Sequence, residues 1–145
     1  MPPDPSEHPK FELAYPGPLR DQLVAAVLSG AKTSTSSLLV EYDEVVDPVP
    51  VVGQRSVMVD STDRPVGIVE IIEVRELMIS EVDLDFAREE GEGYASVASW
   101  REAHERFWNA NVPGVTIDDS TMVVAERFRL VERLDPDQPI GSTSS

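Results

Sequence analysis

The sequence predicts an α+β domain in which about three helices pack on a small mixed β-barrel or sheet. The predicted elements follow the order helix, three strands, two helices and strand, which lacks the regular strand–helix alternation of a doubly wound fold. The 145 residues suit one domain with a single core. Apolar residues make up 41% of the chain and charged residues 27%, which is typical of globular proteins and excludes disorder of the whole chain.

A first helix is predicted over residues 19–29, because apolar residues recur there at helical spacing. These residues are Leu19, Leu23, Val24, Val27 and Leu28. Pro16 and Pro18 precede the helix and Gly30 follows it. Proline at the start of a helix and glycine just past its end are typical boundaries.

The pattern then changes to short β-rich stretches, separated by turn segments such as DPVPVVG and STDRP. The predicted strands are Ser36–Tyr42, Arg55–Asp60, Val66–Arg75 and Thr121–Val131. Two helices are predicted between the third and fourth strands. The first, Ser80–Glu90, opens with Ser80 and Asp83 at capping-box spacing. The second, Ser96–Asn109, carries the clearest helical stripe, which consists of Trp100, Ala103, His104, Phe107 and Trp108.

Both ends of the chain are predicted to be disordered tails, which flank one domain at residues 11–134. Residues 1–10 contain four prolines, and residues 135–145 lack a periodic apolar pattern. No apolar run approaches the roughly 18 residues of a membrane span. The first residues also lack the basic and apolar regions of a signal peptide. We therefore expect a cytoplasmic protein without a membrane partner.

Composition excludes several classes of site. Cysteine is absent, which rules out disulfides, thiol nucleophiles, zinc–cysteine sites and iron–sulfur clusters. The chain has two histidines, of which His8 lies in the proline-rich tail, so we expect no metal site and no cofactor. The net charge of −15 disfavours duplex DNA, since tight duplex binding needs a broad basic face. A small nucleoside-type ligand or single-stranded RNA can still fit a local pocket.

Two glutamates interrupt the apolar rows of predicted strands. Glu70 occupies an inward position of the third strand, and Glu126 occupies an inward position of the last one. A buried carboxylate is unfavourable unless it is paired. Each glutamate is therefore expected to lie near an opening, to bond a partner such as Arg101 or Arg127, or to have a functional role. If the strand registers differ, both are ordinary surface residues.

The acidic segment Arg88–Gly93, with the sequence REEGEG, follows a predicted helix. Carboxylates at a helix C-terminus oppose the helix dipole, so helix stability does not explain them. A solvated charge run and a functional site both fit this segment, although it lacks the spacing of an EF-hand loop. His104 lies on the stripe of Trp100 and Phe107, where either a hydrogen-bonded core residue or a catalytic residue fits. The stripe itself is expected to be core rather than a stacking platform for bases.

The segment Gly30–Ser37 is similar to a phosphate loop only in part. It lacks the glycine-rich approach of that motif and follows a helix instead of a strand, which excludes a nucleoside triphosphate site. Lys32 is the only lysine after Lys10. Because the chain can turn at a helix-to-strand junction, Lys32 and Thr35 can face one pocket.

Four motifs, taken in order, resemble the ASCH domain, a PUA-like β-barrel. They are GxKxxT at Gly30–Thr35, FAxxEGEG at Phe86–Gly93, WRxxHxxF at Trp100–Phe107 and VxERF at Val124–Phe128. The resemblance covers residues 11–133 and is closest to the longer bacterial branch that carries EGEG and WxxxH. It implies that the predicted sheet is a PUA-like small mixed barrel.

The resemblance also implies candidate functions. ASCH domains have been proposed to bind RNA, one bacterial branch is described as ribonucleases, and one small branch hydrolyses the amide of N4-acetylcytidine with a lysine, a threonine and a glutamate. In this sequence those three residues match Lys32, Thr35 and Glu90. The sequence departs from the amidohydrolases, which are shorter, lack the WxxxH helix and have asparagine where Gly91 stands.

In one consistent division of roles, Thr35 attacks the amide, Lys32 activates Thr35, and Glu90 delivers a proton to the leaving amine. A lysine acts as a base only when its neutral form is populated, which burial favours and a neighbouring carboxylate opposes. We expect the cleft between the Lys32–Thr35 junction and the Glu90–Glu92 turn, because a buried lysine needs a carboxylate partner. Further ligand contacts are expected from Thr33, Glu92, Trp100, His104 and Arg127.

Two hypotheses for the function follow. The first is an amidohydrolase acting on N4-acylated cytidine or a related nucleoside amide. The second is a non-catalytic module that binds RNA or a nucleotide, or a ribonuclease. In either case we expect a monomer or a weak homodimer.

Overall fold

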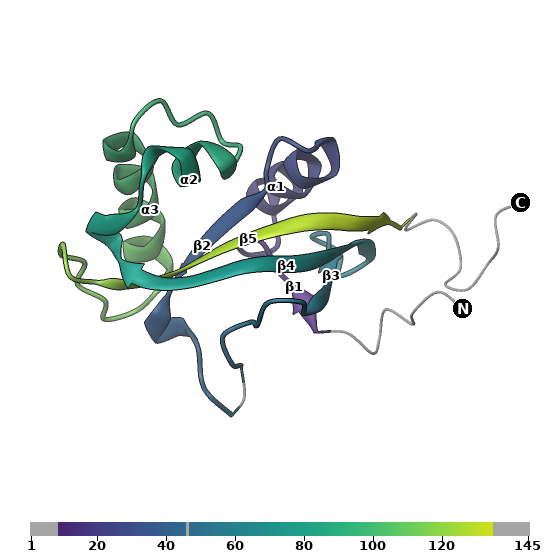
Figure 1. Cartoon of the computed structure of the whole chain (residues 1–145), viewed down its shortest axis with the longest axis horizontal. Coiled ribbons are helices and arrows are strands. Elements are labelled where there is room, and N and C mark those ends of the chain that lie inside the picture. The colour runs from purple at the N-terminus through teal and green to yellow at the C-terminus, as the bar shows by residue number, and fades with distance from the viewer. Residues whose placement is uncertain (1–8, 46, 135–145) are drawn as a thin grey trace, which may run out of the picture.

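The computed structural model describes residues 9–45 and 47–134, which form one mixed sheet and three α-helices (Figure 1). The elements in chain order are β1 Lys10–Phe11, α1 Pro18–Ser29, β2 Ser34–Leu38, β3 Arg55–Val59, β4 Pro65–Met78, α2 Leu84–Glu89, α3 Val97–Asn111 and β5 Met122–Arg133. Short 3₁₀ turns follow β2 at Leu39–Glu41 and β4 at Ile79–Glu81. No helix among the described residues is both long enough and apolar enough to cross a membrane.

The five strands lie in the order β1-β3-β4-β5-β2. β1 is parallel to β3, and the other neighbouring strands are antiparallel. The long strands β4 and β5 form the curved middle of the sheet (Figure 1), while β1 and β2 are its two edges. The predicted α+β class with three helices is confirmed, and the sheet is an open relative of the expected barrel.

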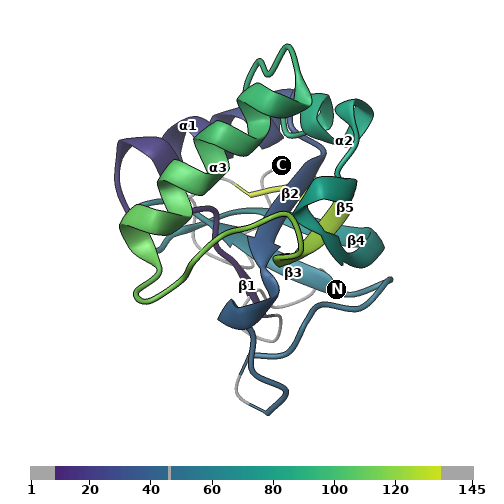
Figure 2. The ribbon, with the colours of Figure 1, turned by 90° about the vertical axis from the view of Figure 1, so that its left-hand side faces the viewer.

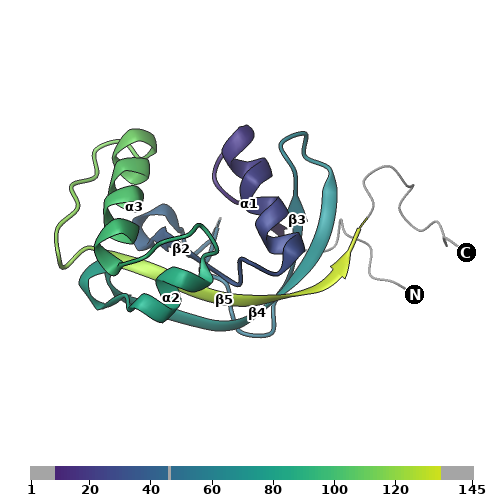
Figure 3. The same ribbon diagram turned by 90° about the horizontal axis from the view of Figure 1, so that it is seen from above.

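Hydrophobic residues cover both faces of the sheet, because successive residues of a strand point to opposite sides. Val123 and Ala125 of β5 pack with the buried residues of α2 and α3, including Trp100 and Trp108. Phe128 packs on the other face with the buried residues of α1 and with Phe11. The edge strand β2 lies between α1 and α3 (Figures 1 and 3), and in Figure 2 α3 is the helix nearest the viewer. The expectation that Trp100 and Trp108 belong to the core is confirmed.

Several helices and strands begin or end at other residues than predicted. The expected helix Ser80–Glu90 begins only at Leu84, because Asp83 is its N-cap and accepts a hydrogen bond from the Phe86 amide. The expected strand Ser36–Tyr42 instead spans Ser34–Leu38 and ends at a 3₁₀ turn. Lys10, expected in the N-terminal tail, pairs with Val57 in β1. The other tail residues, apart from Pro9, lie outside the described residues.

Glu70 is partly exposed and forms ion pairs with Arg55 and Arg129 on the neighbouring strands. Register shifts in β4 on either side of it, between Ile68 and Val69 and again after Ile71, remove the simple alternation on which its inward placement rested. Glu70 is therefore a structural ion-pair residue at the surface.

Candidate functional site

A pocket of about 780 Å³ runs along the edge strand β2, and its walls come from the N-terminal segment, α1, α3, the segment that follows β2 and the turn that follows α2. Five of the eight residues that the sequence proposed for catalysis or ligand contact line it: Lys32, Thr35, Glu90, Glu92 and His104. They come from segments far apart in the chain. Lys32 and Thr35 lie at the junction of α1 and β2, Glu90 and Glu92 in the turn after α2, and His104 in α3.

Lys32 lies between the end of α1 and the start of β2 and is 2% exposed. Its Nζ donates a hydrogen bond of 3.1 Å to the backbone carbonyl of Glu90. The same nitrogen lies 3.5 Å from Glu90 Oε1 and 3.7 Å from Glu92 Oε2. The buried ammonium is thus neutralised by two carboxylates, as the burial of a lone lysine requires.

Glu90 is 1% exposed and is surrounded by hydrogen-bond donors. Oε2 accepts from Ser36 Oγ at 3.0 Å and from the indole nitrogen of Trp100. Oε1 accepts from His104 Nε2 at 3.2 Å and faces the Lys32 ammonium. Burial disfavours the carboxylate, but the hydrogen bond and charge of His104, the charge of Lys32 and the hydrogen bond from Trp100 together lower the pKa of Glu90. This environment favours a carboxylate and does not favour the proton-donor role expected from the sequence.

His104 links this carboxylate to the backbone of α3. Its Nδ1 is 2.8 Å from the carbonyl oxygen of Trp100, and its Nε2 faces Glu90. Both partners are acceptors, so both ring nitrogens must carry a proton for both bonds to form. Burial disfavours the imidazolium, but the hydrogen bond and charge of Glu90 outweigh it and raise the pKa of His104.

The turn that carries Glu90 is tightly fitted to the Lys32 junction. Gly91 has a φ of +74°, and a Cβ added there would lie 2.8 Å from the Cα of Lys32. The Thr33 amide donates a 2.7 Å hydrogen bond to the carbonyl of Glu89. Glycine at position 91 therefore allows the two backbones to approach closely enough for Lys32 to reach Glu90.

Thr35 and Glu126 are direct partners in the β2–β5 pairing, and both line the pocket. Glu126 is 3% exposed, and the hydroxyl of Tyr42 donates a 3.3 Å hydrogen bond to its Oε2. Burial raises the pKa of Glu126 to about 7, although the hydrogen bond from Tyr42 opposes this shift. The expected arginine partner of Glu126 is thus replaced by a tyrosine.

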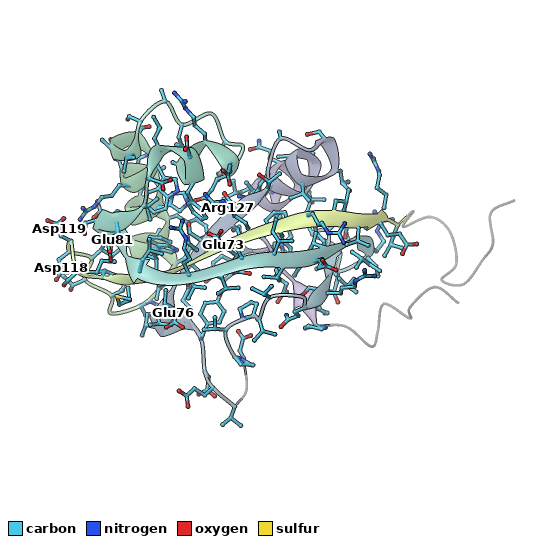
Figure 4. The ribbon with its side chains drawn as sticks, viewed as in Figure 1. Glu73, Glu76, Glu81, Asp118, Asp119 and Arg127 are labelled. Carbon is cyan, nitrogen blue, oxygen red and sulfur yellow. The ribbon has the colours of Figure 1, made fainter. Side chains whose placement is uncertain are left out.

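The three other residues expected to contact a ligand do not line the pocket. Trp100 lies beneath it in the core. Thr33 is exposed and contributes its backbone to the junction. Arg127 follows Glu126 in β5 and so points to the opposite face, where it forms ion pairs with Glu73 and Glu89. Figure 4 shows Arg127 beside Glu73.

Glu90, Glu92 and His104 could in principle hold a metal ion, because their ligand atoms lie within 4.8 Å of one another. However, the Lys32 ammonium lies beside both carboxylates and already supplies the positive charge that they need. The donor set therefore suits an ammonium–carboxylate cluster better than a cation site.

Sequence reasoning missed several pocket residues. Ser36 and Tyr42 orient the two buried carboxylates, and Tyr15 stacks at the pocket wall on the ring of Phe107, with centroids 6.0 Å apart. No motif marks Ser36, Tyr42 or Tyr15, whereas Phe107 is the last residue of the WRxxHxxF motif. For Glu126 a signal did exist, because its carboxylate interrupts an apolar row that the structure confirms as inward-facing.

A family model described as the ASCH domain matches residues 12–132. The chain belongs to the ASCH domain family. An ASCH domain from Lactobacillus crispatus JV V101 is 26% identical to it, with a TM-score of 0.75 over 88% of this chain and 83% of that one. A protein from Enterococcus faecalis V583 is 23% identical, with a TM-score of 0.76 over 86% of this chain and 77% of that one, which shows a shared fold. A comparison with curated protein sequences finds no match.

Within this ASCH domain, the motifs that carried the resemblance meet around one site. The GxKxxT segment supplies Lys32 and Thr35, the EGEG turn supplies Glu90 and Glu92, and the WxxxH helix supplies His104. The fourth motif, in β5, supplies Glu126 to the same pocket.

Proposed function

We propose that this ASCH domain hydrolyses the amide of a small nucleoside-type substrate, of the class of N4-acylated cytidine, in the pocket along β2. The supporting observation is that Lys32, Thr35 and Glu90 line one pocket. These are the residues onto which the resemblance carries the amidohydrolase chemistry. A pocket of about 780 Å³ has room for a nucleoside, since small-molecule sites commonly measure roughly 300–1,000 Å³.

The charges of the pocket favour an uncharged substrate over a polyanion. Its acidic lining residues are Glu12, Glu41, Asp47, Glu90, Glu92 and Glu126. Lys32 is already occupied by two of these carboxylates. Apolar and aromatic side chains, among them Leu23, Tyr15 and Phe107, offer a surface for the base.

The chemistry assigned to the site is acyl transfer. Thr35 supplies the attacking hydroxyl, which is a weak nucleophile until a base takes its proton. Lys32 supplies positive charge to the oxyanion that forms at the attacked carbonyl. Glu90, with Glu92, keeps the Lys32 amine at a fixed position between β2 and α2.

We expect Thr35→Ala to lower kcat/KM for N4-acetylcytidine by about 100-fold or more, because it removes the nucleophile. The measurement is the release of cytidine over time. The matched control is Thr33→Ala, which removes the same hydroxyl from an exposed position outside the pocket and is expected to keep wild-type turnover. Absence of turnover by the wild-type protein, or full turnover by Thr35→Ala, contradicts the proposal.

The alternative is a module that binds a nucleotide or single-stranded RNA without cleaving it. It is favoured by the set of donors around Glu90, which holds this carboxylate in one orientation, as in a rigid binding site. The same assay separates the two functions. Binding without release of cytidine supports the module, and binding that weakens steeply with salt identifies phosphate contacts.

A further inference from the structure

Glu126 is a second buried carboxyl group in the pocket, and neither the resemblance nor the hydrogen-bond network of Glu90 gives it a role. Thr35 is its direct partner across the antiparallel pair β2–β5. Side chains at such positions share a face, with Cβ atoms about 4.5–5.5 Å apart. The carboxyl of Glu126 is therefore within reach of the Thr35 hydroxyl from the neighbouring strand.

The two pocket glutamates differ in how many donors they accept. Glu90 has Ser36 and Trp100 on one oxygen and His104 and Lys32 on the other. Within the described part of the chain, one hydrogen bond reaches the Glu126 carboxyl, and it comes from Tyr42. Glu126 thus keeps free acceptor capacity on the pocket side, whereas a proton placed on Glu90 displaces one of its existing donors.

We propose that Glu126, and not Glu90, transfers the protons of the reaction at Thr35. This inference rests on the proposed amidohydrolase function. The Glu126 carboxylate takes the hydroxyl proton as Thr35 Oγ bonds to the acyl carbon, and the carbonyl oxygen becomes an oxyanion beside Lys32. When the C–N bond breaks, protonated Glu126 gives this proton to the leaving nitrogen, which leaves an acyl ester on Thr35.

In the second half of the reaction Glu126 again accepts a proton first and then donates it. Glu126 takes a proton from a water molecule as the water oxygen attacks the ester carbonyl. The bond between the acyl carbon and Thr35 Oγ then breaks, and Glu126 returns the proton to Oγ. The products are the free amine and a carboxylic acid, water is the only co-reactant consumed, and the site is restored.

The surroundings of Glu126 suit such a shuttle. Its neighbour on β4 is Val74, which carries no charge, and Tyr42 faces it from the segment after β2. The other charged or titratable groups of the pocket are Lys10, Glu12, Tyr15, Lys32, Glu41, Asp47, Glu90, Glu92, Tyr94 and His104. Because burial raises the pKa of Glu126 to about 7, both its protonated and its ionised forms are populated near neutral pH.

The test is the pH profile of kcat/KM for N4-acetylcytidine in the full chain. In the wild type we expect the rate to rise as the pH passes through about 7, because Glu126 must be ionised to accept the first proton. Glu126→Gln is expected to lower kcat/KM by about 100-fold or more and to abolish this rise. Tyr42→Phe removes a hydrogen bond that lowers the pKa of Glu126, so the rise should move to higher pH.

Glu70→Gln is the matched control, since it changes a strand glutamate outside the pocket and is expected to keep both rate and profile. Melting temperatures of all variants, measured at the same pH, show whether a loss of rate is a loss of folding. Wild-type turnover that persists in a folded Glu126→Gln, with the rise intact, overturns the assignment of Glu126 but leaves the proposed function standing. Absence of wild-type turnover overturns both.

Discussion

Replacing Glu90 by glutamine is expected to lower the free energy of unfolding by about 3–5 kcal/mol, the range typical for breaking a buried ion pair on one side. The substitution leaves the buried Lys32 with Glu92 as its remaining carboxylate. It also places an amide nitrogen, which is a donor, among the donors Ser36, Trp100 and His104. Urea unfolding at neutral pH measures this difference. A typical domain is stabilised by about 5–15 kcal/mol, so the expected loss is about a third of the total.

The neighbouring substitution Glu89→Gln is the control. Glu89 has a side chain that is 35% exposed and pairs with Arg127, so its loss should cost about 1 kcal/mol or less. The pKa of Glu90 is lowered in the folded state, so its stabilising contribution is present above the unfolded pKa of 4.5 and disappears as the pH falls through the folded value. The gap between wild type and Glu90→Gln should therefore close in acid. A Glu90→Gln protein as stable as Glu89→Gln at pH 7 contradicts this account.

The helices that were predicted well have strong local signals. α1 has Pro18 at its first turn and Gly30 in the left-handed conformation just past its end, and α3 is capped by Ser96. β4 and β5 were harder, because bulges shift which residue faces which side, and a bulge depends on the partner strand rather than on local sequence. This is why Glu70 and Glu126 differ in the structure although both interrupt an apolar row in the sequence. Glu70 is partly exposed, whereas Glu126 is buried.

The residues that form the site could also be predicted only in part from the sequence. The motifs identified Lys32, Thr35 and Glu90 as residues that belong together, and the structure places all three on one pocket. Successive residues of a strand point to opposite faces, so Glu126 and Arg127 cannot both face the pocket. The prediction that Arg127 contacts a ligand therefore conflicted with the inward placement of Glu126 in the sequence. The donors around Glu90 could not be predicted, because they come from β2 and α3, whose contact with the EGEG turn is a property of the tertiary packing.

The geometry of the site depends on one close approach of two backbones. Lys32 can reach the carbonyl and the carboxylate of Glu90 only if the end of α2 lies against the junction between α1 and β2. Gly91 is the residue at this contact, and its left-handed φ of +74° turns the chain from α2 into the loop that carries Glu92. Asparagine at this position, as in the shorter amidohydrolases, has a Cβ for which this arrangement leaves no room.

Gly91→Ala is therefore expected to lower the free energy of unfolding by about 2–4 kcal/mol, of which about 1 kcal/mol is left-handed strain and the rest is overpacking. The new Cβ would meet the backbone of Ala31 and lie 2.8 Å from the Cα of Lys32, so the junction must move away. Because this movement separates Lys32 from Glu90, turnover should fall even at temperatures where the variant stays folded.

Gly93→Ala provides the matched control for this effect. Gly93 has a similar φ of +80°, but a Cβ added there meets nothing within 4 Å. The control therefore carries the left-handed strain, about 1 kcal/mol, without the backbone clash, and Lys32 should keep its contacts with Glu90. Urea unfolding and cytidine release, measured on both variants, separate strain from displacement. Equal losses of stability in Gly91→Ala and Gly93→Ala would mean that the junction yields without cost, and that the close approach does not hold Lys32 in place.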